Sequence, residues 1–302
     1  MPDNPIHMAD LVNMADPRAV MNEVKILVRL MVPDFPMFRL DRVYHDVVDL
    51  YQGRYPGYRA YNTEYHDLRH TMDALLAISR LIHGAWVLEK RISVRNMELA
   101  LIATLMHDTG YIQAATDTEG TGAKYTLSHV VRSVEFMRAY FEENKLTENE
   151  FRDAAAMLKC TGLNTDLRTL SFSDPDVELC GKMLGAADIL GQMADRTYLE
   201  KLLFLYHEFK EAGLSGYESE RDLLEKTLGF YDMIRKRLAG DLSGVDRYLR
   251  PHFMDRYGVD QNLYEEAVEK NIAYLRQVLG NHDHRDLLRR GGVVGKLKKK
   301  GM

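Results

Sequence analysis

Prolines are almost absent from the middle of this 302-residue chain. None of the eight prolines lies between Pro56 and Pro175 or between Pro175 and Pro251, so both stretches lack the residue that most strongly breaks helices. Apolar residues recur there at intervals of three and four, whereas the alternation typical of half-buried strands is scarce. The sequence therefore predicts an all-α fold built as a multi-helix bundle.

Capping residues, prolines and glycines mark where the helices begin and end. Thr147 to Glu150 reads as a capping box, and Pro175 stands at the preferred first position of a helix. The expected organisation is an N-terminal extension with one helix (1–39), a helical domain (40–280) and a basic flexible tail (281–302). The main expected helices cover 17–32, 38–52, 67–82, 94–107, 151–160, 175–193, 219–238 and 260–279.

Charge and composition restrict the partners and the compartment. The net charge is −5 even though six basic residues cluster after position 288, so the rest of the chain is acidic and would repel a nucleic acid. The longest apolar run, Leu99–Met106, is too short to cross a membrane. Two cysteines and a start without signal-peptide features favour a cytoplasmic protein with no membrane or nucleic-acid partner. The oligomeric state stays open.

Two histidines four residues apart are the first candidate for chemistry. Residues 65–73 read YHDLRHTMD, which places His66 and His70 on one face if the segment is helical. This spacing alone is a weak indication of a metal. Asp73, three residues after His70, is a candidate for orienting a neighbouring imidazole or for a surface salt bridge.

Buried acidic residues strengthen the case for a metal. His107 and Asp108 end an apolar helix, and Asp188 stands among apolar and small residues. An ionised carboxylate in such surroundings costs several kcal/mol unless it is paired or binds a cation. With His70, these residues offer two nitrogens and two oxygens, which suits one or two divalent ions of zinc, manganese, iron or magnesium.

The order of these residues, H…HD…D, resembles the HD-domain superfamily of metal-dependent phosphohydrolases, whose members are all-α. More specifically, residues 65–73 are similar to the YHNxxHxxD signature of class I cyclic-nucleotide phosphodiesterases. The resemblance covers roughly residues 40–280 and implies that His66 is the catalytic general acid. The metal ligands that it implies are His70, His107, Asp108 and Asp188, with Asp108 also catalytic as the bridge between two ions.

Two further segments are similar to the family pattern but differ from it at some positions. Residues 227–232 read TLGFYD, similar to the phosphodiesterase segment QxGFxD, so Phe230 and Thr227 are expected to bind substrate. Thr227 replaces the glutamine that reads a purine edge, which weakens the case for a cyclic nucleotide. His129 follows the His-Asp pair at a distance where many HD proteins place another ligand, whereas Cys160 is expected to be a small buried hydrophobe.

The expected function is hydrolysis of a small phosphoester by metal-activated water, with His66 protonating the leaving group. The substrate is a cyclic nucleotide or another small phosphodiester or nucleotide. One alternative is a di-iron HD-type oxygenase, although His129 and the four core ligands supply five of the six usual protein ligands. Another is a catalytically silent nucleotide-sensing module. The loop 113–124 is a candidate lid beside the site.

Overall fold

The computed structural model describes residues 6–281 and 283–299 and is all-helical within them. The α-helices are α1 (Pro17–Met31), α2 (Met37–Tyr51), α3 (Leu68–Val87), α4 (Val94–Met106), α5 (His129–Glu143), α6 (Glu148–Lys159), α7 (Pro175–Met193), α8 (Tyr198–Glu211), α9 (Glu220–Ala239), α10 (Leu249–Tyr257), α11 (Leu263–Leu279), α12 (His284–Leu287) and α13 (Val293–Lys299). Short 3₁₀ turns join them: η1 (Met8–Asp10), η2 (Thr109–Tyr111), η3 (Gly122–Tyr125), η4 (Leu167–Thr169), η5 (Val245–Tyr248) and η6 (Arg290–Gly292).

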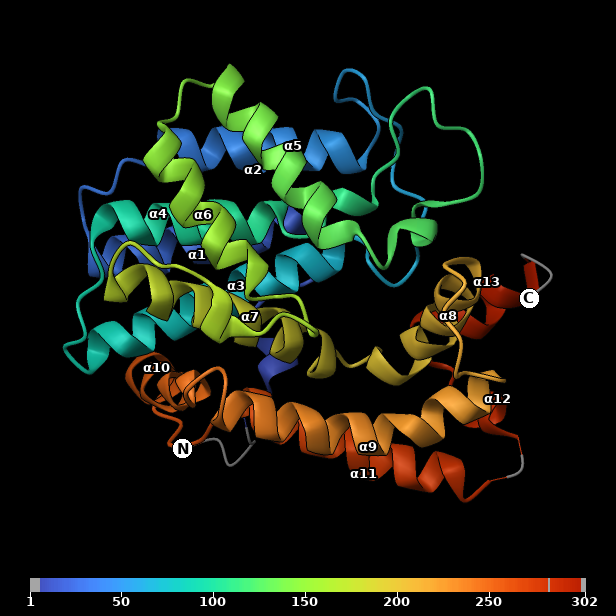
Figure 1. Cartoon of the computed structure of the whole chain (residues 1–302). Helices are drawn as coiled ribbons and strands as arrows, with labels where there is room; N and C mark the ends of the chain where they lie inside the picture. The colour runs from blue at the N-terminus through green and yellow to red at the C-terminus, as the bar shows by residue number, and fades with distance from the viewer. Residues whose placement is uncertain (1–5, 282, 300–302) are drawn as a thin grey trace.

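The centre of the bundle is the pair α3 and α7, which pack along much of their length (Figure 1). Helices α1 and α10 cover α3, α6 covers α7, and α4 lies between α3 and α6. Helices α2 and α5 form the upper side in Figure 1, whereas α9 and α11 run together along the lower side. Because other helices enclose much of α3, α4 and α7, several polar side chains in this region, among them His70, His107 and Asp108, are buried.

Local sequence signals account for where these helices begin. The Thr147 hydroxyl accepts a hydrogen bond from the backbone N–H of Glu150, whose carboxylate accepts one from the N–H of Thr147, so the predicted capping box is present. Asp174 caps α7 ahead of Pro175. Asp67 caps α3 by accepting from the backbone N–H of His70 at 2.9 Å, which fixes the first turn that carries this histidine.

The two chain ends differ from the expected extension and tail. Helix α1 is integral to the core, since Val20, Val24 and Leu27 are fully buried and the helix packs on α3. Residues 283–299, expected to be a flexible tail, instead fold into α12, η6 and α13, with Leu288 and Leu297 fully buried. These apolar residues between the basic ones anchor the segment against α8 and α11. The rest of the predicted tail includes residues 282 and 300–302, outside the described residues.

A membrane-spanning helix must be both long enough and apolar enough to cross the bilayer. Across residues 6–281 and 283–299, every helix is too short or too polar to span a bilayer.

Candidate metal centre

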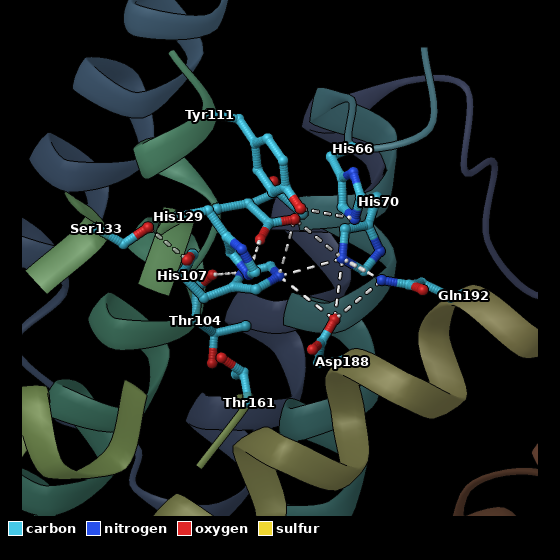
Figure 2. Close-up of polar contacts among 12 residues, drawn as sticks. His66, His70, Thr104, His107, Tyr111, His129, Ser133, Thr161, Asp188 and Gln192 are labelled. Atoms are coloured by element: carbon cyan, nitrogen blue, oxygen red, sulfur yellow. Dashed lines mark hydrogen bonds and ion pairs between the residues drawn. The ribbon is translucent and has the colours of Figure 1, made fainter. Parts of the chain in front are cut away.

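Four side chains from three buried helices meet in the interior of the bundle (Figure 2). His70 lies in the first turn of α3, His107 and Asp108 follow the last residue of α4, and Asp188 lies on α7. His70 Nε2 is 3.0 Å from Asp188 Oδ1, 3.1 Å from His107 Nε2 and 3.3 Å from Asp108 Oδ2. We call these four residues the His/Asp cluster. They are four of the five predicted ligands; the fifth is His129.

The spacing of these atoms is that of donors around a single cation. His107 Nε2 is also 3.4 Å from Asp108 Oδ2 and 3.5 Å from Asp188 Oδ1. Metal bonds of ~2.1 Å to nitrogen and oxygen place neighbouring ligands about 3.0 to 3.4 Å apart in octahedral or tetrahedral sites. Among the described residues, His70, His107 and Asp108 form a group whose donor atoms are close enough to hold one ion.

Hydrogen bonds outside the cluster select the ring nitrogen that faces it. His107 Nδ1 donates to the carbonyl of Thr104 at 2.7 Å, which leaves its Nε2 as a lone pair aimed at the cluster. The carboxylate oxygen Asp108 Oδ2 is buried without a hydrogen-bond donor among the described residues. A lone pair and a carboxylate oxygen that face one another in a dry site fit a cation between them.

The pKa shifts of the cluster residues also indicate a site that needs positive charge. Burial lowers the pKa of His70, but the neighbouring carboxylates of Asp108 and Asp188 outweigh this effect and raise the pKa to about 10. Burial raises the pKa of Asp188, but the neighbouring imidazoles of His107 and His70 hold it below its usual range. The two carboxylates are therefore stable as anions only beside positive charge. Protonated imidazoles would supply that charge in the absence of a metal, whereas one divalent ion supplies it at the same position and leaves the Nε2 lone pairs as ligands.

His129 faces the other oxygen of Asp108. Its Nε2 is 4.0 Å from Asp108 Oδ1, and its Nδ1 donates to the carbonyl of Thr126 at 2.7 Å. Gly110 makes this approach possible, because a Cβ atom there would lie 2.0 Å from the carbonyl oxygen of His129. Ser133 secures the turn by accepting from the Gly110 N–H at 2.9 Å and donating to the carbonyl of His107 at 2.6 Å. Asp108 thus faces the cluster with one oxygen and His129 with the other.

His66 stands beside the cluster and is held by a carboxylate from α8. Its Nδ1 is 2.8 Å from Glu208 Oε2, while Glu208 Oε1 accepts the backbone N–H groups of Glu64 and Tyr65 at 2.8 and 2.7 Å. An ionised Glu208 can only accept, so His66 donates from Nδ1 and its Nε2 faces the site. That nitrogen is 3.3 Å from the hydroxyl of Tyr111.

The ring of Tyr111 separates two of the histidines. It stacks on His66 with the ring centres 4.2 Å apart and on His129 with the centres 4.6 Å apart. Figure 2 shows this phenol between the two imidazoles at the edge of the cluster. The stack closes one side of the site with an apolar surface.

A family model described as Npun_R2479-like matches residues 57–242. The chain belongs to this family. Comparison with curated proteins and with solved structures gives no match. The matched part of the Npun_R2479-like chain includes the His/Asp cluster together with His66, His129 and Glu208.

The predicted substrate residues of this Npun_R2479-like protein lie elsewhere in the bundle. Thr227 and Phe230 belong to α9, which packs mainly on α8, α11 and η5. Thr227 is buried and its hydroxyl donates to the carbonyl of Leu223 at 2.9 Å, whereas Phe230 packs against the hydrophobic core. The described contacts place neither residue against the His/Asp cluster.

Two residues at the site, Glu208 and Gln192, were not identified from the sequence. Glu208 carries no motif, because its role depends on how α8 packs against the turn before α3. Gln192 follows Asp188 by one helical turn and donates to Asp188 Oδ1 at 3.2 Å, and its carbonyl accepts from Tyr65 at 2.9 Å. The spacing of Asp188 and Gln192 was the only available signal for the second residue. Cys160 is a free buried thiol, as expected.

The candidate lid is tied down at several points. The Thr121 hydroxyl donates to Glu211 at 2.7 Å, the Gly122 N–H donates to Asn62 at 2.8 Å, and Lys124 pairs with Asp117 at 2.5 Å. The loop is therefore ordered against α8 and the segment before α3.

Proposed function

We propose that this protein is a metal-dependent hydrolase of the HD type that cleaves a small phosphoester. The observation that carries the proposal is the convergence of two imidazole nitrogens and two carboxylate oxygens in a buried site, with a glutamate-held imidazole beside them. His70, His107, Asp108 and Asp188 would hold one divalent ion, and His129 with Asp108 offers a position for a second. This mixed nitrogen and oxygen set suits manganese, zinc, iron or magnesium.

The chemistry assigned to the bound ion is polarisation of a phosphoryl oxygen and a lowered pKa of a bound water. The protein's own contribution is the proton for the leaving oxygen. Glu208 holds His66 with Nε2 toward the site. A protonated His66 can therefore donate to the leaving oxygen as its bond to phosphorus breaks. The phenol of Tyr111 and the buried helices limit the access of bulk water.

Separate roles for His66 and His70 provide the test. The metal-stripped protein is reloaded with each of manganese, zinc, iron and magnesium and assayed with alkyl and nitrophenyl phosphodiesters. His70→Ala should lose metal and activity together. His66→Ala should keep the metal and lose activity by ~10²–10⁴-fold on the alkyl ester. The loss should be much smaller with nitrophenolate, because this leaving group departs without a proton.

Each other outcome counts against a specific part of the proposal. Equal losses from His66→Ala on both esters would contradict its role as an acid. Loss of metal from His66→Ala would make this histidine a ligand. Oxygen consumption by the iron-loaded protein without phosphoester turnover would favour the di-iron oxygenase. Metal binding with neither activity would favour the silent sensing module.

A further inference from the structure

A cavity lies between the N-terminal segment with η1 and helices α3, α7 and α11. Its volume is about 600 Å³, which is enough for a small organic molecule. Much of its wall is apolar and includes Leu76, Ala194, Leu263 and Ala267. Arg80, on its inner wall, follows His70 on α3 by nearly three helical turns. The wall also includes Arg69 and Asp73, close to His70 in the sequence, but none of the four residues of the His/Asp cluster lines the cavity.

Arg80 is a buried cation with no counter-ion among the described residues. Its side chain is among the largest fully buried ones, and its Nη1 donates to the hydroxyl of Tyr264 at 3.0 Å. The guanidinium lies 5.4 Å from the ring centre of Phe253 and 5.5 Å from that of Tyr264. Its Nε and Nη2 have no hydrogen-bond acceptor, and no carboxylate of the described chain forms an ion pair with it.

The charges on the rest of the wall leave this positive potential uncancelled. The buried acids Asp73 and Asp195 both pair with Arg69, at 4.0 and 3.0 Å, and Glu266 pairs with Lys270. Asp10 is exposed at the rim. Arg290 adds a further cation, stacked over Tyr274 at 4.5 Å and without an ion pair among the described residues.

An unpaired buried charge is costly, and removal of its partner typically destabilises a protein by ~3–5 kcal/mol. In surroundings of low dielectric, its potential also extends into the adjacent cavity with little screening. An anion in the cavity would remove this cost, and the apolar wall would bury an apolar body attached to it.

We propose that this cavity binds a small organic anion, a carboxylate or phosphate on an apolar body, whose charged end neutralises Arg80. The apolar body lies against Leu76, Leu263 and Ala267. This site goes beyond the proposed hydrolase function and depends on none of its residues.

Calorimetric titration of the metal-loaded protein with octanoate, octyl phosphate and octanol tests the charge requirement. At least one of the two anions should bind at one site per chain, at least about tenfold more tightly than octanol, a difference of about 1.4 kcal/mol. Comparison of octanoate with octyl phosphate identifies the preferred anionic group. Equal affinity for octanol, or no saturable binding of either anion, would overturn the proposal.

Two variants locate the binding site. Arg80→Met keeps the length of the side chain and removes its charge, so the preference for the anion over octanol should disappear. Without ligand, the variant should unfold at the same or a higher temperature than the parent, because an uncompensated charge has been removed. A preference that survives in Arg80→Met would overturn the proposal.

Ala267→Phe fills the cavity and leaves Arg80 intact, so it tests the location of the ligand even if Arg80→Met does not fold. Binding of the anion should weaken by about tenfold or more. Unchanged affinity in Ala267→Phe would place the ligand elsewhere and overturn the proposal. Metal content, measured in parallel, should equal that of the parent in both variants.

Discussion

His66 Nδ1 lies 2.8 Å from Glu208 Oε2, although the two residues are 142 positions apart in the chain. The same carboxylate accepts the backbone N–H groups of Glu64 and Tyr65, so one side chain of α8 holds both the ring and the turn that carries it. This arrangement sets which nitrogen of His66 faces the His/Asp cluster. It links the geometry of the candidate acid to the packing of α8.

Glu208→Gln should therefore impair turnover without removing the metal. The amide can present an N–H to His66 Nδ1 in place of an acceptor, which disfavours the N–H at Nδ1 and the ring orientation that the proposed reaction needs. We expect a ~10–100-fold loss of activity with full metal content. Activity and elemental analysis of the same preparation provide the measurement. Glu211→Gln, on the same helix at the candidate lid, is the matched control, and an equal loss there would point to a general defect of α8.

The metal stoichiometry should fall in steps as ligands are removed. His107→Ala and Asp188→Ala each remove a donor from the His/Asp cluster, so each should abolish stoichiometric metal binding. His129→Ala should remove at most the second ion. Its Nε2 faces Asp108 Oδ1, at 4.0 Å, and not the oxygen Oδ2 that faces the other ligands. Elemental analysis after dialysis measures all three. His45→Ala, on the exposed side of α2, should bind as much metal as the parent. Full occupancy in Asp188→Ala would exclude Asp188 as a ligand.

The sequence was informative wherever the signal was local or imposed by burial. The absence of proline and the apolar periodicity predicted an all-α chain, and the structure confirms this class. Two acidic residues in apolar helices, Asp108 and Asp188, required a cationic partner wherever the helices packed, so their meeting with His70 and His107 followed from the cost of burying charge.

Features that depend on packing between distant segments were not predictable in the same way. Glu208 lies on a helix whose pattern contains several acids, and nothing local distinguishes the one that reaches His66. Phe230 was predicted to contact substrate from a short sequence match; the structure shows it packed against the hydrophobic core, and the substrate contact stays a prediction. The basic residues of the C-terminal segment led us to predict a flexible tail. In the structure, Leu288 and Leu297 of this segment are fully buried and anchor it.

His252 should make the stability of the protein depend on pH below neutrality. It is fully buried, 3.2 Å from the Nδ1 of His83, and burial together with the charge of Arg80 lowers its pKa from 6.5 to about 2. The unfolded chain binds this proton below pH 6.5, whereas the folded chain does not. Stability is therefore retained above pH 6.5 and lost as the pH falls toward 2, by at most about 1.4 kcal/mol per pH unit.

Urea unfolding of the parent and of His252→Gln at about pH 5 and about pH 7.5 measures this contribution. The variant should lose less stability than the parent on acidification. Some dependence should remain, because burial also lowers the pKa of His83. The exposed His45→Gln serves as the control and should behave as the parent does. A pH dependence in His252→Gln equal to that of the parent would show that His252 is not the group responsible.

Variants of Tyr111 can separate the contribution of its aromatic ring from that of its hydroxyl. Its ring keeps His66 and His129 apart, with the centres of these two imidazoles 6.2 Å from each other, and its hydroxyl is 3.3 Å from His66 Nε2. Tyr111→Phe preserves the stack and removes one hydrogen bond, so thermal stability and metal content should stay close to those of the parent and activity should fall by about tenfold or less.

Tyr111→Ala removes the ring as well and should be far more damaging. Truncation of a buried aromatic side chain typically costs ~3–5 kcal/mol and leaves a cavity beside both imidazoles. We therefore expect a lower unfolding temperature and a much larger loss of activity, measured alongside Tyr111→Phe with the same phosphodiesters. If the two variants lose activity equally while Tyr111→Phe keeps its stability and its metal, the spacer role is wrong and the hydroxyl itself takes part in the proton transfer.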